Sequence, residues 1–196
     1  KAAQDEFAQY GFDLSSIQRI IETSGIPRGS FYQYFEDKND IYGVVIREIK
    51  DQKMEFLAPV LQMRKNLGFF DFLMLLEKQA FQFAKQNPQS VQIGRDIIIS
   101  KTLEKEKLLK TIVEEAYSQI QTDPNCLFLE LIKNAMTREE ITDAYSPETV
   151  NFYVQTMVEG INKRLLALNT SGPFGKEGES ILEEFISILK HGLCNL

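Results

Sequence analysis

The sequence predicts an all-α protein of about nine helices, with a small N-terminal domain followed by a larger one. Apolar residues recur every three or four positions along most of the 196 residues, which is the spacing of one face of a helix. No segment alternates convincingly between apolar and polar residues as a half-buried strand does. Glycine and proline interrupt the helical pattern at intervals that fit helices of ordinary length.

The first part of the chain is expected to form three short helices. Gly11 stops the first, and Ser15 and Ser16 supply an N-cap for the second. Gly25 ends the second helix, and Pro27 suits the first turn of the third, where proline has no N–H to lose. The helices expected here are residues 2–10, a helix that ends at Thr23, and residues 28–34.

Longer helices are expected in the rest of the chain. Asp37 is suited to cap the fourth helix, which we expect to be interrupted near Pro59. The helices expected here are residues 38–57, 69–86, 91–100, 103–121, 126–136, 147–168 and 180–193. Because the first three helices are short and the others longer, we place a domain boundary near Ile46, between domains of residues 1–46 and 47–196.

An aromatic-rich stretch, SGIPRGSFYQYFEDK at residues 24–38, points to a function. Two short helices joined by a turn that contains glycine are typical of a helix-turn-helix, whose second helix enters the major groove of DNA. Phe31 and Phe35 are four residues apart and face the apolar side of the preceding helix, so we expect them in the core.

The remaining side chains of this helix are suited to contact DNA. Arg28 can donate two hydrogen bonds to guanine, and Gln33 can pair with adenine. Tyr32, Tyr34 and Lys38 suit phosphate oxygens, which fix the register of the protein without reading sequence. Gly29 has no side chain and lets the helix approach the duplex closely. The DNA-contacting residues predicted from this stretch are Arg28, Gly29, Ser30, Tyr32, Gln33, Tyr34 and Lys38.

These residues resemble the DNA-binding domain of the tetracycline-repressor (TetR) family of bacterial transcription regulators. The matching stretches are FAQYGF, SSIQRIIETSGIPRGSFYQYF and DKNDIYGVV. The family's spaced pattern of glycines, small hydroxyl residue, aromatics and lysine falls on Gly25, Ile26, Gly29, Ser30, Phe31, Tyr32, Phe35 and Lys38. The resemblance implies that Ser16 also touches a phosphate. Two positions depart from it: Pro27 replaces the usual serine, and Ile21 replaces a small alanine.

The charge of this region is unusual for a DNA-binding domain. The whole chain has a net charge of −6, and residues 1–50 contain six basic and eight acidic residues, which gives −2. Neutralisation of phosphates dominates the affinity of proteins for DNA. Either a basic arm that would precede Lys1 is absent from this sequence, or acidic residues such as Asp5, Glu6 and Asp13 face away from the duplex.

The last two helices carry apolar stripes that are wider than one neighbouring helix needs. Pairing them with their copies in a second subunit would make a two-fold interface, and the resemblance implies the same homodimer, which inverted-repeat operators require. Alternatively, both stripes line the core of a single chain. The predicted interface residues are Val150, Val154, Met157, Val158, Ile161, Leu165, Phe185 and Leu189.

The middle of the chain is rich in aromatic residues, which fits the inducer pocket that the resemblance implies. Arg95 and Asp96 interrupt an apolar segment, and they either anchor a ligand or pair with each other or face solvent. The predicted ligand-contacting residues are Phe72, Phe81, Arg95, Tyr117 and Phe128. We therefore expect a repressor that a small lipophilic molecule, such as an acyl chain or hydrophobic drug, releases from DNA.

Other classes of function are disfavoured. The single histidine, His191, removes most zinc sites and catalytic triads, so we expect no enzyme, no metal and no cofactor. The two cysteines, Cys126 and Cys194, are too few for a disulfide framework and fit a reduced cytoplasm. No apolar run approaches the roughly 18 residues of a membrane span. A helical scaffold that binds only protein is the alternative, but it would not need the polar face of residues 28–38.

Overall fold

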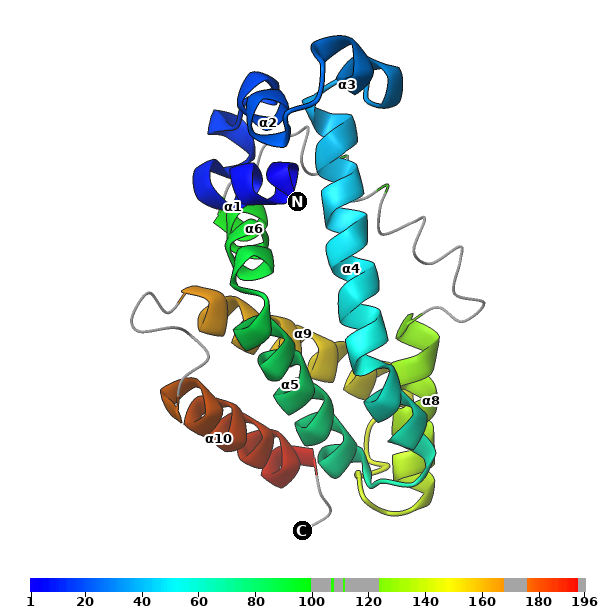
Figure 1. Ribbon diagram of the computed structural model, residues 1–196. Helices are drawn as coiled ribbons and strands as arrows, with labels where there is room; N and C mark the ends of the chain where they lie inside the picture. Colours follow the sequence, from blue (N-terminus) through cyan, green and yellow to red (C-terminus); the bar gives the residue numbers. More distant parts are fainter. Residues whose placement is uncertain (100–106, 108–110, 112–123, 168–175, 194–196) are drawn as a thin grey trace. The chain divides into compact units, whose positions relative to one another are not determined.

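The computed structural model describes residues 1–99, 107, 111, 124–167 and 176–193, and in these ranges the chain is helical (Figure 1). The all-α prediction is confirmed: the described residues form nine α-helices and one short 3₁₀-helix, Met63–Lys65. The α-helices are α1 (Ala2–Leu14), α2 (Ile17–Ser24), α3 (Arg28–Tyr34), α4 (Lys38–Gln62), α5 (Phe69–Gln86), α6 (Pro88–Ile99), α8 (Pro124–Thr137), α9 (Pro147–Ala167) and α10 (Lys176–Leu193).

Local signals set several helix ends, but two predicted ends are wrong. The first helix, predicted to stop at Gly11, runs on to Leu14 with a kink at Gly11, where φ is 68°. The bounds of α3 and α5 are those that the sequence predicts. The interruption predicted near Pro59 is wrong, because α4 continues through Pro59 to Gln62. Proline removes one intrahelical hydrogen bond, which would be accepted by the carbonyl of Glu55. Both residues are exposed, so water can hydrate that carbonyl. The helix predicted over residues 103–121 lies almost entirely outside the described residues.

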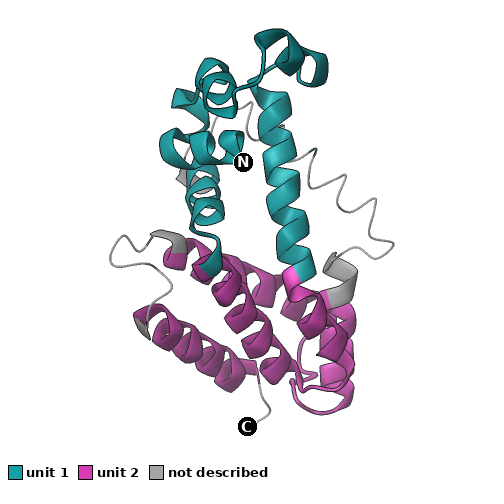
Figure 2. Cartoon of the chain, viewed as in Figure 1, with its two compact units in different colours: residues 1–55, 86–116 teal, residues 56–85, 117–196 magenta. Residues whose placement is uncertain are grey.

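The chain divides into two compact units (Figure 2). Unit 1 comprises residues 1–55 and 86–116, and unit 2 comprises residues 56–85 and 117–196. The boundary predicted near Ile46 lies inside α4 and stays a prediction. In unit 1, α6 packs against α1 although more than 70 residues separate them along the chain. The buried core of unit 1 consists of Ala3, Phe7, Phe12, Ile20, Phe31, Ile41, Tyr42, Val45 and Ile93.

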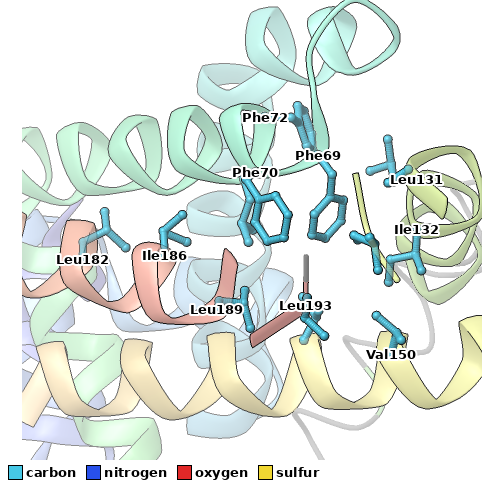
Figure 3. Packing of buried hydrophobic residues seen from close by; sticks show 14 of the residues in the cluster. Phe69, Phe70, Phe72, Leu131, Ile132, Val150, Leu182, Ile186, Leu189 and Leu193 are labelled. Atoms are coloured by element: carbon cyan, nitrogen blue, oxygen red, sulfur yellow. The ribbon is translucent and has the colours of Figure 1, made fainter. Parts of the chain in front are cut away.

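Unit 2 has a larger apolar core, to which α5, α8, α9 and α10 all contribute (Figure 3). Phe69 and Phe70 at the start of α5 meet edge to face, with ring centroids 5.2 Å apart. Leu182, Ile186, Leu189 and Leu193 form one stripe of α10 that points into this core. Two ion pairs at the surface, Lys78 with Glu183 and Lys85 with Glu179, join α5 to α10.

The described helices include none that is both long enough and apolar enough to cross a membrane. The same part of the chain contains no group of three or more histidine, cysteine or acidic residues arranged to hold a metal ion.

Candidate nucleic-acid interface

The turn between α2 and α3 has the geometry that its glycine and proline predict. Gly25 caps α2 in the left-handed conformation, at φ 69°, and its N–H donates to the carbonyl of Ile21. A side chain with a Cβ is strained at this φ, so glycine is favoured. Pro27 is the N-cap of α3, with φ −61°. The fixed φ of proline matches this entry into the helix.

Helix α3 has one buried residue and an otherwise open face. The Phe31 side chain is 1% exposed, and its ring lies 5.2 Å from those of Tyr32 and Phe35. Phe35 is half-buried, so both phenylalanines pack inward as their spacing predicts. The other predicted DNA contacts of α3 are available at the surface: Arg28, Gly29, Tyr32, Gln33 and Tyr34 are exposed, and Ser30 is half-buried.

Arg28 lies beside a hollow between α2 and α3. The guanidinium carbon is 5.8 Å from the centre of the Tyr32 ring, within reach of a cation–π interaction. The hollow has a volume of about 250 Å³, and it is lined by Ile17, Gln18, Ile21, Glu22, Arg28 and Tyr32. Tyr32 therefore limits the positions that the Arg28 side chain takes, although both remain accessible.

Gly29 presents bare backbone to solvent. A Cβ built at this position meets no atom of the chain within 4 Å, so nothing inside the protein requires glycine there. The absence of a side chain instead leaves space in front of the helix. A duplex backbone or base edge can approach α3 most closely at this point.

Lys38 at the start of α4 is held by the connection between α1 and α2. Its Nζ donates to the carbonyls of Asp13 at 3.2 Å and Ser15 at 3.3 Å. The same ammonium lies 4.6 Å from the centre of the Phe12 ring. Asp37 caps α4, as predicted, by accepting a hydrogen bond from the Asp40 N–H at 2.9 Å. Two of the three Lys38 donors are thus engaged within the chain, which leaves one for a phosphate.

Ser16, the N-cap of α2, is fixed through its backbone by Glu6. Oε1 of Glu6 accepts from the Ser16 N–H at 2.8 Å and from Nε and Nη2 of Arg19 at 2.9 and 2.6 Å. Hydrogen bonding to Glu6 raises the pKa of the Arg19 guanidinium, which stays charged. The sequence did not predict that Glu6 and Arg19 pair, because 13 residues and a change of helix separate them.

Several acidic residues of the N-terminal region have partners inside the protein. Glu6 is 7% exposed and pairs with Arg19. Asp5 accepts a hydrogen bond from Gln89 of α6, and Asp37 and Asp40 bind backbone N–H groups at the start of α4. The carboxylates of these residues are therefore hydrogen-bonded within the protein. The negative formal charge of residues 1–50 therefore overstates the charge that α3 itself presents, since the exposed face of α3 carries Arg28 and no acid.

The predicted ligand residues are divided between the two units. Phe72, Phe81 and Phe128 belong to unit 2, where Phe72 is part of the buried core and Phe128 packs against it. Arg95 belongs to α6 in unit 1 and is half-buried. Its neighbour Asp96 accepts a hydrogen bond from the Phe12 N–H at 3.1 Å, so this carboxylate joins α6 to α1. Tyr117 lies outside the described residues.

The predicted dimer residues are mostly covered by their own chain. Val150, Val154, Leu165 and Leu189 are buried in a single subunit, and Met157, Val158, Ile161 and Phe185 are half-buried. Other apolar side chains of the same two helices are open to solvent: Phe152 is 73% exposed and Ile188 is 66% exposed. A partner subunit can reach these exposed residues, whereas it cannot reach the buried four without rearrangement of the unit 2 core.

Comparison with known proteins places the N-terminal region in one family. Residues 1–45 match the family described as bacterial regulatory proteins, tetR family. Over 178 residues the chain is 25% identical to the uncharacterized HTH-type transcriptional regulator YdgC of Bacillus subtilis, covering 81% of this chain and 90% of that protein. Over 177 residues it is 28% identical to the HTH-type transcriptional repressor BepR of Brucella suis, covering 81% and 74%.

The likeness of fold extends to the whole chain. The transcriptional regulator FadR of Bacillus subtilis, solved in complex with stearoyl-CoA, superposes with a TM-score of 0.72 over 98% of this chain and 96% of that one, at 14% identity. The matched family consists of transcriptional regulators and not of enzymes, in agreement with the prediction from the single histidine. Residues 1–45 therefore belong to the tetR family of bacterial regulatory proteins, and the comparisons support a DNA-binding transcriptional regulator.

Proposed function

We propose that the protein is a homodimeric, cytoplasmic repressor that reads an inverted-repeat operator with α3 and is released by a small lipophilic molecule. The observation that carries this proposal is the division of α3 into one buried phenylalanine and a continuous exposed face. The relative BepR, which is named a repressor, supports this direction of regulation.

Within this proposal, the exposed face of α3 divides into reading and positioning residues. Arg28 and Gln33 hydrogen-bond to base edges, because their side chains match guanine and adenine. Tyr32, Tyr34, Ser30 and the remaining donor of Lys38 bind phosphates, together with the hydroxyl of Ser16. Gly29 lets the backbone of α3 come close to the duplex.

The homodimer is formed by α9 and α10 through their exposed apolar residues. On α10, Ile181, Phe185, Ile188 and Gly192 follow one another at steps of four, three and four residues, and they form a second stripe beside the buried one. Gly192 is exposed, with no atom within 4 Å of an added Cβ, so a partner helix can pass close to it. The proposed interface uses these residues together with Phe152 of α9.

The effector is a lipophilic molecule that binds among the aromatic residues of unit 2. That unit contains Phe72, Phe81 and Phe128, and the structurally similar FadR was solved with stearoyl-CoA, which carries a long acyl chain. The energetic demand is modest, since a coupling of about 1–3 kcal/mol between effector and operator changes affinity by about 5- to 150-fold.

The first test is selection of bound duplexes from a random DNA pool at two salt concentrations. Enrichment of an inverted repeat supports sequence-specific binding by a dimer. Retention that is weak, unselective and lost at the higher salt concentration contradicts it, because such retention is only electrostatic.

Variants of single residues then assign roles on the enriched duplex. Arg28→Ala is expected to cost about 1–3 kcal/mol and to relax the preference at one base pair, whereas Lys38→Ala weakens binding to all sequences and lowers the salt slope by about 1. Lys53→Ala is the matched control, because it removes the same charge on α4 roughly 22 Å further along the helix. Equal affinity of Arg28→Ala and the wild-type chain would remove Arg28 from the base-reading residues.

A protein-binding scaffold is the competing function. A scaffold retains its partner in the Arg28→Ala variant and selects no duplex from the pool, so the same two experiments separate the two functions.

A further inference from the structure

The connection between α1 and α2 is fastened by charged side chains from three helices. Nη2 of Arg19 donates to the carbonyl of Leu14 at 2.7 Å, and Lys38 donates to the carbonyls of Asp13 and Ser15. The backbone carbonyls of a connecting segment are usually hydrated by water, because such segments lie at the protein surface. Here the backbone that leads into Ser16 is instead bound by side chains on both sides.

Glu6 is the centre of this arrangement. It is 7% exposed, and a single oxygen of its carboxylate accepts all three hydrogen bonds from Ser16 and Arg19. Burial of a carboxylate is costly unless it is paired and hydrogen-bonded, and both conditions are met here. The Arg19 guanidinium also lies 4.4 Å from the centre of the Tyr10 ring, which restricts its movement.

This arrangement fixes the backbone of Ser16. Its N–H is bound to Glu6, and its carbonyl accepts the first hydrogen bond of α2, from Ile20 at 3.1 Å. Its hydroxyl does not cap α2, unlike many serines at this position. Glu6 instead accepts from the N–H of Ser16 itself, and the Ser16 hydroxyl is left available to a group outside the protein.

We propose that Glu6 is a positioning residue for DNA binding, which holds the start of α2 so that the Ser16 hydroxyl meets a phosphate of the operator. This inference rests on the proposed function, in which Ser16 contacts DNA. Arg19 takes part by balancing the charge of Glu6 and by orienting its carboxylate.

The sign of the effect distinguishes positioning from simple electrostatics. Glu6→Gln removes a negative charge close to the DNA-binding surface, and charge alone would make the variant bind DNA more tightly. Positioning requires the opposite, because glutamine keeps the size of the side chain but weakens the bonds to the Arg19 guanidinium and the Ser16 N–H.

The experiment is a double-mutant cycle of Glu6→Gln and Ser16→Ala in the full chain, with affinity for the selected duplex measured by fluorescence anisotropy at fixed salt. We expect Glu6→Gln to weaken binding about tenfold, which corresponds to about 1.4 kcal/mol, in the wild-type background. In the Ser16→Ala background we expect less than about a twofold loss, because the positioned hydroxyl is already absent. Asp5→Asn is the matched control, since it makes the same change of charge one residue earlier and should leave binding equal or slightly tighter.

Different outcomes identify different failures. Tighter or unchanged binding by Glu6→Gln, or an equal loss in both backgrounds, overturns the positioning role while the proposed function stands. Full affinity of Ser16→Ala overturns the phosphate contact and the positioning role together. A wild-type chain that selects no duplex overturns the proposed function itself. If circular dichroism shows that Glu6→Gln is unfolded, Arg19→Lys replaces it in the same cycle, because it keeps both charges and changes only the geometry of the pair.

Discussion

Helices α3 and α10 expose side chains of opposite character. In α3 the buried position is Phe31, and the exposed residues are polar or carry a polar group at the tip of an aromatic ring. In α10 a complete apolar stripe is buried, and Ile188, which adjoins the buried Leu189, is 66% exposed. Water accommodates the first kind of surface at little cost, whereas a second apolar stripe is typical of a face that another protein covers.

The comparison separates the residues that maintain the fold from those that are open to binding partners. Buried residues of both units maintain the fold, and exposed residues determine what each unit can bind. The exposed face of α3 offers hydrogen-bond donors with a defined geometry, which suits base edges and phosphates. The exposed stripe of α10 offers only apolar contact, which suits a second copy of the same stripe.

The largest expected effect separates the buried and exposed faces of α3. Phe31→Ala removes a fully buried aromatic side chain and should lower the free energy of unfolding by about 3–5 kcal/mol. Tyr34→Ala, at 78% exposure, should change it by less than about 0.5 kcal/mol while weakening DNA binding. Urea denaturation followed by circular dichroism measures the free energy of unfolding of both variants. Similar losses of stability in the two variants would show that α3 has no free face.

The next effect separates two neighbouring residues of α10. Leu189→Ala should lower the free energy of unfolding by about 2–5 kcal/mol, because Leu189 is 1% exposed in the core of unit 2. Ile188→Glu should leave the fold of the subunit intact but weaken dimerisation by about tenfold or more, because the charge would be buried in the interface.

Analytical ultracentrifugation measures this second change, with Ser187→Glu as the control on the adjoining exposed face of the helix. An Ile188→Glu variant that dimerises as tightly as the wild-type chain would place the interface elsewhere.

The sequence predicts features that depend on neighbouring residues along the chain. Gly25 and Pro27 define the turn before α3, and their conformations follow from the backbone freedom of one and the fixed φ of the other. The exposed face of α3 is equally local, because helical spacing alone separates Phe31 from Tyr32, Gln33 and Tyr34.

Features that depend on contacts between distant segments could not be predicted. The bond from the Phe12 N–H to Asp96 joins residues 84 positions apart, and the hydrogen bonds of Glu6 join two helices. Periodicity also identifies an apolar stripe without identifying what covers it. For that reason the sequence assigned Val154 and Leu189 to a subunit interface, although their own chain buries them.

A smaller effect tests the contact between α6 and α1. Asp96→Ala removes the acceptor of the Phe12 N–H and should lower the free energy of unfolding by about 1.5 kcal/mol, since bonds to charged groups are the stronger ones. The close approach of Asp96 also explains Gly11, where φ is 68° and an added Cβ would lie 2.7 Å from Oδ1 of Asp96. Gln92→Ala, an exposed residue one turn earlier on α6, is the control. A loss of stability no larger than that of Gln92→Ala would mean that the bond to Phe12 contributes nothing net.

The smallest effect concerns Tyr42, whose buried hydroxyl has no hydrogen-bond partner among the described residues. The ring packs against both Phe7 and Phe12, whose ring centroids are each 4.8 Å from its own. Tyr42→Phe keeps this packing and removes an unsatisfied polar group, so it should raise the free energy of unfolding by up to about 1 kcal/mol. Thermal denaturation at neutral pH measures the gain, with Tyr34→Phe on the exposed face of α3 as the control.

The same variant has a predictable dependence on pH. Burial raises the pKa of Tyr42 above its ordinary value of about 10, and the negative charges of Asp96 and Asp13 raise it further. The folded chain holds the Tyr42 proton more tightly than the unfolded chain does. The contribution of this proton to the free energy of unfolding is therefore fully present below pH 10 and is lost as the pH rises above 10. The phenylalanine variant lacks this group, so its advantage should grow from pH 10 upward. A constant difference between the two chains across that range would mean that the Tyr42 hydroxyl reaches solvent in the folded protein, and the unit 1 core would then be looser than its buried aromatic residues indicate.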